Sequence, residues 1–271
     1  MIRPALHTFS TLVAAAWLAP AHALESPWSV ADRAEVRLIG DHGVNASIRA
    51  GVEVRLQKGW KTYWRYPGDA GVPPRFDWSG SDNLAGTVVQ WPAPERLIDA
   101  SGMQSIGYHD HVLFPVIVRA SDPARPVKLR LKFDFAVCEQ TCVPADATLA
   151  LDIPPGESTA VPPLDQAVRR VPQRASLGKN AAGLAIQSAR LERGAKPHLV
   201  IEATAGSDLF AEGPDDRWAL PLPEKIESKP GKDRFRLPLE GAPNGAPPIP
   251  PRVVLTLVGA AAAIEVEVPL D

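Results

Sequence analysis

The sequence predicts an all-β protein, with an antiparallel β-sandwich followed by a second β-rich domain. Apolar and polar residues alternate with period two in several short segments, and turns rich in proline and glycine separate these segments. The 271 residues include 29 prolines. That is roughly twice the ordinary usage, which disfavours long helices. Because 45% of the residues are hydrophobic, the chain can bury a core.

The first 23 residues predict a secretory signal peptide. Arg3 is their only charged residue, an apolar run covers 9–18, and a small-x-small cleavage sequence stands at 21–23. The run is too short to span a bilayer, and no later apolar stretch reaches that length. We therefore expect a mature chain that begins near Leu24 and is exported to the periplasm, where a disulfide can persist.

The first domain is expected over residues 24–155. Apolar and polar residues alternate over 46–56, which is the pattern of a half-buried strand, and the same period recurs over 129–137. The segment 112–118 is apolar on both faces. Pro115 within it predicts an edge strand or a bulge, because proline has no N–H for a sheet ladder.

A linker is expected at 156–174, because the sequence IPPGESTAVPP is too rich in proline for a core strand. A short helical turn is expected within it, over 164–171. The second β-rich domain then occupies 175–271, with alternating strands at 235–239 and 264–268. This second domain contains no cysteine.

Charge and motifs exclude several classes of function. The chain has 29 Lys and Arg against 31 Asp and Glu, a net charge of −2, so it lacks the basic surface that nucleic acids and anionic membranes attract. The phosphate-loop, dinucleotide-binding and zinc-protease motifs GxxxxGK[ST], GxGxxG and HExxH do not occur. We expect no nucleic-acid partner, no membrane insertion and no cofactor.

The two cysteines, Cys138 and Cys142, lie in the sequence FAVCEQTCVPADATLAL. Odd-numbered residues are apolar on both sides of them, which predicts two strands joined by the loop 139–141, with both cysteines on the face opposite the core. Such a hairpin brings the strand ends to within about 5.5 Å, which suits a disulfide. Both sulfurs would then be open to attack by a partner thiolate.

Three interpretations of this pair remain open. A disulfide that closes so short a loop contributes roughly 2 kcal/mol in the chain-entropy model, so a structural staple would add little to a domain that has its own core. A pair on an exposed hairpin also suits thiol-disulfide exchange. The third interpretation is metal binding, since His109 and His111 would share a strand face that could hold copper or zinc if Met103 and the thiols lie nearby. Two solvated surface histidines are the simpler explanation of that sequence.

Three segments together resemble a known family. They are GWKTYWRYPGDAGVPPRFDW (59–78), GYHDHVLFPVIV (107–118) and CEQTCVP (138–144). In order and spacing they are similar to the N-terminal periplasmic domain of the thiol:disulfide interchange protein DsbD family, and most similar to its copper-sensitivity-suppressor branch. The resemblance covers residues 28–155 and implies an immunoglobulin-like sandwich.

The resemblance implies that Cys138 and Cys142 are the exchanging thiols, and family usage favours Cys142 as the cysteine that links to partners. It also implies that a loop over 100–107 caps the pair. Here three residues separate the cysteines, where the classical domain has a longer spacing, and the cap lacks the usual aromatic residue. Four residues are assigned to the cap or to the partner surface: Tyr63, Trp64, Met103 and Tyr108.

The expected function is a periplasmic thiol-disulfide exchange module, compatible with a protein-disulfide reductase. It would relay reducing equivalents from a membrane or thioredoxin-like donor to periplasmic thioredoxin-like proteins. Because no membrane or thioredoxin-like domain precedes Asp271, we expect a membrane thiol transporter that is encoded separately. The alternative is a redox-inert sandwich that binds a partner protein, copper or a glycan, with a purely structural disulfide.

Overall fold

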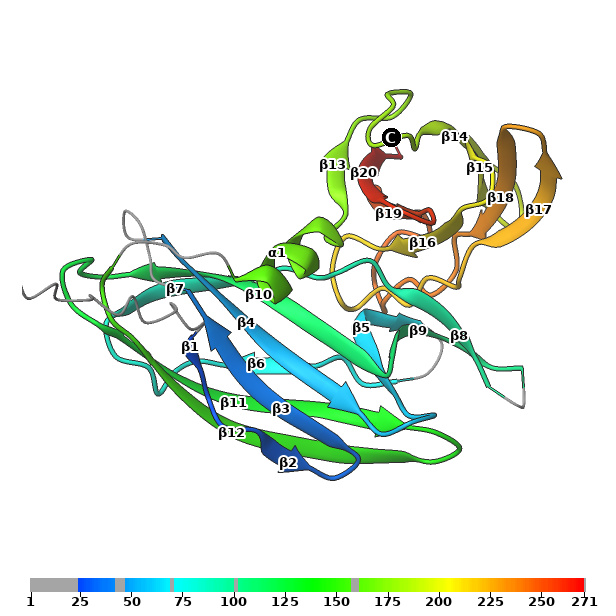
Figure 1. The fold of residues 1–271 in the computed structure, drawn as a ribbon. Coiled ribbons are helices and arrows are strands. Elements are labelled where there is room, and N and C mark those ends of the chain that lie inside the picture. The colour runs from blue at the N-terminus through cyan, green and yellow to red at the C-terminus, as the bar shows by residue number, and fades with distance from the viewer. Residues whose placement is uncertain (1–23, 42–46, 69–70, 100–101, 157–160, 271) are drawn as a thin grey trace, which may run out of the picture.

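The chain folds into two β-sandwiches, as seen in a computed structural model that describes residues 24–41, 47–68, 71–99, 102–156 and 161–270 (Figure 1). This architecture confirms the all-β prediction. The expected signal peptide at 1–23 lies outside the described residues. Among the described residues, no helix has the length and apolar character needed to cross a bilayer.

The first sheet of the N-terminal sandwich has the strand order β1-β3-β4-β10-β7, with β2 paired to β3. Its strands are β1 (Leu24–Glu25), β2 (Ser29–Ala31), β3 (Ala34–Gly40), β4 (Ser47–Leu56), β7 (Leu84–Val89) and β10 (His111–Ala120). The alternation over 46–56 therefore marks a strand, β4, as predicted. Its even-numbered residues, such as Val52 and Val54, are buried in the core between the two sheets.

The second sheet has the order β12-β11-β5-β9-β8, with β6 paired to β11. Its strands are β5 (Lys61–Gly68), β6 (Arg75–Asp77), β8 (Glu95–Ile98), β9 (Gln104–His109), β11 (Val127–Cys138) and β12 (Cys142–Ile153). Odd-numbered residues of β11 and β12, including Leu131 and Leu149, are buried against the first sheet. The parity read from the sequence is confirmed for both strands.

Pro115 does not lie on an edge strand, so that expectation is wrong. The strand β10 pairs with β4 on one side and with β7 on the other. The carbonyl of Pro115 accepts a hydrogen bond from the Gln90 N–H at 2.7 Å. The nitrogen and carbonyl of one strand residue point to the same side, so the nitrogen of Pro115 faces the end of β7 at Val89. The lack of an N–H on Pro115 therefore removes no hydrogen bond to β4.

The helix α1 (Pro162–Arg169) covers part of the outer face of the first sheet. Its residues Leu164 and Ala167 are three apart, so they share one helix face, and they are buried with Ile39 and Leu113. The helix begins before the expected 164–171 because proline is well tolerated in the first turn. Much of the expected linker thus packs on the first sandwich, and the domain boundaries themselves stay a prediction.

The C-terminal sandwich consists of a sheet in the order β13-β20-β19-β16 and a sheet in the order β14-β15-β18-β17. Their strands are β13 (Gln173–Ala175), β14 (Ile186–Glu192), β15 (His198–Thr204), β16 (Asp208–Glu212), β17 (Glu224–Lys229), β18 (Lys232–Pro238), β19 (Arg252–Val258) and β20 (Ala263–Pro269). The strands expected at 235–239 and 264–268 correspond to β18 and β20. Their alternating apolar residues fill a separate core.

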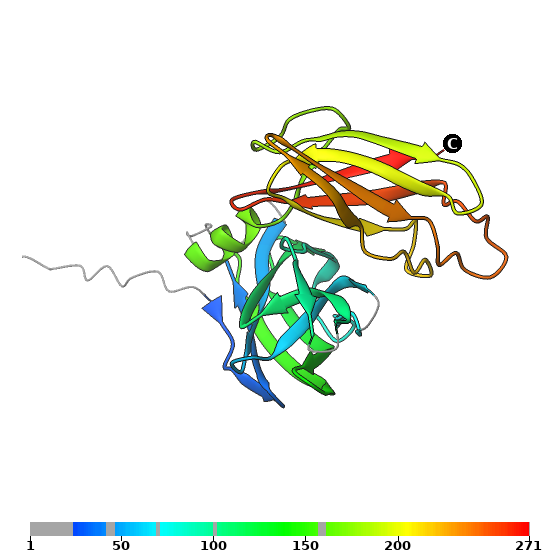
Figure 2. The same cartoon turned by 90° about the vertical axis from the view of Figure 1, so that its right-hand side faces the viewer.

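Ion pairs join the two sandwiches where β5 and β8 face β16 and β20 (Figures 1 and 2). Arg65 lies between Glu212 and Glu265, and its Nη2 is 2.6 Å from Glu212 Oε2. Arg96 binds both carboxylate oxygens of Asp208 at 2.9 and 3.0 Å. The two carboxylates raise the pKa of Arg65 and more than offset the opposing effect of its burial.

Apolar contacts accompany these ion pairs. Trp64 packs on Phe210 of the second sandwich with ring centroids 6.2 Å apart, and Phe210 and Leu222 belong to the core of the first sandwich. The Tyr66 hydroxyl donates a hydrogen bond to the Leu220 carbonyl. Because ion pairs, apolar contacts and a hydrogen bond all cross this boundary, β5 is anchored to the second sandwich along much of its length.

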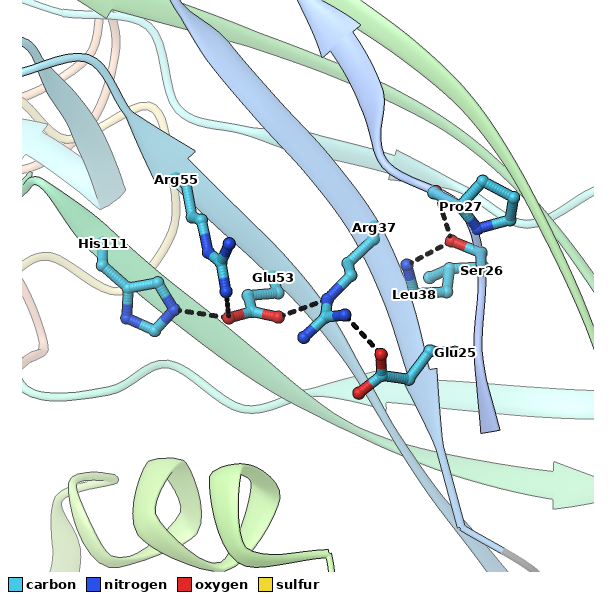
Figure 3. Close-up of polar contacts among 8 residues, drawn as sticks. All are labelled: Glu25, Ser26, Pro27, Arg37, Leu38, Glu53, Arg55 and His111. Atoms are coloured by element: carbon cyan, nitrogen blue, oxygen red, sulfur yellow. Dashed lines mark hydrogen bonds and ion pairs between the residues drawn. The ribbon is translucent and has the colours of Figure 1, made fainter. Parts of the chain in front are cut away.

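Glu53 is a buried carboxylate on the outer face of β4 (Figure 3). Its Oε2 accepts a 2.6 Å hydrogen bond from Arg37 Nε, and its Oε1 is 2.9 Å from His111 Nε2. Arg37 also pairs with Glu25. Burial alone raises the pKa of Glu53, but the hydrogen bonds from His111 and Arg37 outweigh it, and the net effect lowers the pKa.

Replacing Glu53 with Gln should lower the free energy of unfolding at pH 7 by about 1–3 kcal/mol, because Arg37 and His111 lose a charged acceptor. A carboxylate with a lowered folded pKa stabilises above its unfolded pKa, about 4.3 for Glu, and this contribution is lost as pH falls through the folded pKa. The difference in free energy of unfolding between wild type and variant, measured by urea titration, should therefore shrink below about pH 4.3.

Glu95→Gln is the matched control, because Glu95 forms an exposed pair with His109. It should change the free energy of unfolding by less than about 1 kcal/mol. Equal effects of the two substitutions at pH 7 would contradict a stabilising role for the buried carboxylate.

Candidate redox site

The β11–β12 hairpin carries the disulfide at its tip. The two strands pair without interruption from Val127↔Ile153 to Cys138↔Cys142. The Cα atoms of the two cysteines are 4.1 Å apart, and their sulfurs are bonded at 2.05 Å. The loop 139–141 and the disulfide thus match the prediction from the sequence.

The two cysteines differ in exposure. Cys142 is exposed, whereas Cys138 is only 1% exposed. The parity argument correctly placed both cysteines opposite the main core, but the expectation that both are open to attack is wrong for Cys138. The neighbouring strand β5 pairs with β11 at Lys61↔Cys138, and Tyr63 on β5 forms a small buried cluster with Cys138 and Ala136. An incoming thiolate can therefore reach Cys142 only.

The Tyr63 hydroxyl contacts both sulfurs. Its oxygen is 2.8 Å from Cys138 Sγ and 3.2 Å from Cys142 Sγ. Burial and the negative charge of Asp99 raise the pKa of Tyr63, so its hydroxyl remains protonated at neutral pH. Tyr63 is therefore a hydrogen-bond donor placed to stabilise a thiolate when the disulfide opens.

Close backbone contacts hold Tyr63 in this position. A Cβ atom at Gly71 would lie 2.5 Å from Cδ1 and Cε1 of the Tyr63 ring, so only glycine lets this backbone lie against the ring. Beside it, the Thr62 hydroxyl donates a 2.9 Å hydrogen bond to the Ala136 carbonyl. Gly71 and the strand β5 thus act together to fix the ring beside the disulfide.

Asp99 and Met103 form the base of the hairpin loop between β8 and β9. The Met103 N–H donates to Asp99 Oδ1 at 3.0 Å, and the Asp99 N–H donates to the Met103 carbonyl at 3.1 Å. Met103 is 49% exposed. The negative charge of Asp99 contributes to the raised pKa of Tyr63, and part of the expected cap, 100–101, is outside the described residues. The role of Met103 in a cap stays a prediction.

Trp64 and Tyr108 are buried, in contrast to the expectation that they belong to the cap or to the partner surface. Both are buried in the main core, whereas Tyr63 and Cys138 form a separate cluster. Consecutive strand residues point to opposite faces, so Trp64 is directed away from Tyr63. The Tyr108 hydroxyl donates to the Pro92 carbonyl at 2.8 Å.

His109 and His111 do not share a strand face, so that expectation is also wrong. Asp110, with φ of 57°, turns the chain between β9 and β10, and the two strands belong to different sheets. His109 Nδ1 lies 3.3 Å from Glu95 Oε2, and His111 binds the buried Glu53 instead. Within the described ranges, no three His, Cys, Asp or Glu residues are grouped as metal ligands.

Comparison with known proteins agrees with this geometry. The profile of the family "Thiol:disulfide interchange protein DsbD, N-terminal" matches residues 38–154. Residues 38–154 form a DsbD N-terminal-like domain. The disulfide hairpin, Tyr63 and Asp99 all lie within this domain.

A solved structure extends the likeness beyond the DsbD N-terminal-like domain. The crystal structure of the N-terminal periplasmic domain of ScsB from Proteus mirabilis superposes with a TM-score of 0.71 at 21% sequence identity. The alignment covers 92% of this chain and 99% of that chain, so the similarity of fold includes the second sandwich. No curated protein matches the sequence.

Tyr63 was expected in the cap or the partner surface, but its contact with both sulfurs could not be read from the sequence. Asp99 and Gly71 were not predicted from the sequence to be site residues. Gly71 stands in the specific PGDAG segment, and Asp99 directly precedes the expected cap. Their positions in the sequence could have pointed to these two residues. Their proximity to Tyr63 could not be predicted, because it depends on how three separate segments fold together.

Replacing Tyr63 with Phe should slow reduction of the disulfide by dithiothreitol about tenfold or more, because a hydrogen bond to a charged thiolate contributes about 1.5–3 kcal/mol. The reaction can be followed by rapid mixing and acid quenching, after which the new protein thiols are alkylated and counted by mass spectrometry. Tyr108→Phe is the matched control, since it removes a buried hydroxyl that contacts a carbonyl rather than sulfur. Equal reduction rates in Tyr63→Phe and wild type would show that the hydroxyl does not assist the reaction.

Proposed function

We propose that this chain is a periplasmic thiol-disulfide exchange module, in which the Cys138–Cys142 disulfide accepts reducing equivalents from a donor and passes them to other thiol-disulfide proteins. One observation carries the proposal. One cysteine of the pair is exposed, the other is buried, and a protonated hydroxyl contacts both sulfurs. A disulfide that only staples a hairpin has no need of a donor positioned against both sulfurs.

The exchange begins when the thiolate of a reduced partner attacks Cys142 Sγ. A bond forms between the two proteins while the Cys138–Cys142 bond breaks, and Cys138 leaves as a thiolate that accepts a hydrogen bond from Tyr63. The second thiol of the partner then attacks the partner's own sulfur in the mixed disulfide. Cys142 is released as a thiolate, two electrons have been transferred, and both thiolates take up protons from solvent.

Delivery to a client follows the same steps in reverse. The exposed Cys142 thiolate attacks the disulfide of an oxidised client, and one client sulfur leaves as a thiolate. Cys138 then attacks Cys142 in the mixed disulfide, which restores the intramolecular bond and releases the client as a dithiol. The buried cysteine is therefore the resolving residue in this direction.

Two features support the proposed location and partners. The N-terminal sequence has the pattern of a signal peptide, and the fold is that of a domain described as periplasmic. The partners are thioredoxin-like proteins and a separate membrane thiol transporter, since a reactive dithiol is needed to reduce the disulfide and resolve the mixed species.

The difference in exposure predicts which single-cysteine variant captures a partner. The probe is a thioredoxin-like protein whose resolving cysteine is replaced by Ala and whose remaining cysteine carries a thionitrobenzoate group. The Cys138→Ala variant should form a mixed disulfide through Cys142, at least about tenfold faster than Cys142→Ala does through the buried Cys138. Released thionitrobenzoate and non-reducing electrophoresis measure the reaction.

The double variant Cys138→Ala/Cys142→Ala is the control and should release nothing. A faster reaction through Cys138 would contradict the proposed order of attack. If neither folded single variant forms the complex, the electron-carrier proposal fails and a binding module with a structural disulfide takes its place.

A further inference from the structure

A groove lies on the outer face of the β11–β12 hairpin, and its lining begins two residues from the exposed Cys142. Its volume is about 320 Å³. One wall is formed by the segment that follows Gly71, and the floor is formed by the two hairpin strands. The lining residues that matter here are Val72, Pro73, Arg75, Asp134, Pro144 and Asp146.

The register of the hairpin places this groove relative to the disulfide. The cross-strand pairs Cys138↔Cys142, Ala136↔Pro144 and Asp134↔Asp146 follow one another at intervals of two residues. Residues two apart on a strand share a face, so the groove continues the face that carries the disulfide. It starts two residues from Cys142 and reaches Asp146 at about 13 Å, since a strand rises about 3.3 Å per residue.

The groove combines apolar and acidic surface. Val72 is 54% exposed at its wall, and Pro144 is exposed on its floor. Asp134 and Asp146 stand directly opposite each other, an arrangement that costs stability because like charges repel. In the part of the chain that the structure describes, neither carboxylate has an ion-pair or hydrogen-bond partner, although Arg75 lies opposite Asp134 on the adjoining strand. One negative charge in excess therefore faces the groove.

A redox partner must approach this face. Formation of a mixed disulfide brings the partner's sulfur to within bonding distance of Cys142, so the surface around that sulfur necessarily covers the neighbouring residues of the hairpin. On the groove side the partner meets a recess with an apolar wall and one negative charge in excess. An apolar side chain and a basic side chain of the partner would complement that recess.

We propose that this groove is the docking site for the redox partner of Cys142, and that it selects a partner with a Lys or Arg side chain about 13 Å from its reactive sulfur. This inference rests on the proposed exchange function and adds a specificity element to it. The groove discriminates between thiol partners by charge and takes no part in the bond exchange itself.

Paired peptides test the proposal in the full chain carrying Cys138→Ala. Each extended peptide has one cysteine activated with thionitrobenzoate and differs only in bearing Lys or Glu four residues from that cysteine. The Cys142 thiolate attacks the peptide sulfur, a protein–peptide disulfide forms, and thionitrobenzoate leaves. At low ionic strength the Lys peptide should react about two- to fivefold faster than the Glu peptide, the effect of one exposed ion pair.

Asp146→Asn and Asp134→Asn should each bring the ratio of the Lys-peptide rate to the Glu-peptide rate closer to one. Asp152→Asn makes the same change of charge near the other end of β12, where Asp152 pairs with Arg130, and should leave the preference unchanged. The mixed disulfide of mercaptoethanol and thionitrobenzoate, whose only charge is the carboxylate that all these probes share, should react at equal rates with all variants, because it does not reach the groove. Circular dichroism checks that each variant is folded.

The groove proposal is overturned if the wild-type groove shows no preference for Lys, or if Asp152→Asn removes the preference as fully as Asp146→Asn does. Failure of the exchange function looks different. In that case the activated thioredoxin-like protein and both peptides fail to react with Cys142, whereas the small hydroxyethyl disulfide still does.

Discussion

The contact of the Tyr63 hydroxyl with both sulfurs is the interaction on which the arrangement of this protein depends. It requires β5 to pair with β11 at the disulfide, Gly71 to lie flat against the ring, and Cys138 to be covered while Cys142 stays exposed. The next residues of the same strand, Trp64 and Arg65, contact the second sandwich. One strand therefore connects the redox site to the interface between the sandwiches.

This arrangement explains why so short a disulfide is present. Closing a loop of this length stabilises the fold by only about 2 kcal/mol in the chain-entropy model, which is little for a domain that already has an extensive core. The unequal exposure of the two cysteines instead suits the proposed exchange. In that proposal, attack is directed to Cys142 and the leaving thiolate forms at Cys138, beside a protonated hydroxyl with a raised pKa.

Much of the fold followed from the sequence because alternation of apolar residues decides which face of a strand is buried. This alternation correctly predicted the strands β4, β11, β12, β18 and β20. The loop 139–141 was predicted because the strands on both sides of it bury residues of the same parity. The burial of Cys138 did not follow, because it depends on a side chain from β5. Trp64 and Tyr108 were misplaced for a related reason, since an aromatic motif does not reveal which of its members points to each face.

The most direct test of the account is the reduction potential of the Cys138–Cys142 pair, measured by equilibrating the whole chain with a thioredoxin-like protein of known potential. The account predicts a value within the range of known exchange proteins, about −270 to −120 mV, and full reversibility. A potential below about −300 mV, with no exchange at equilibrium, would identify a structural disulfide and contradict the account.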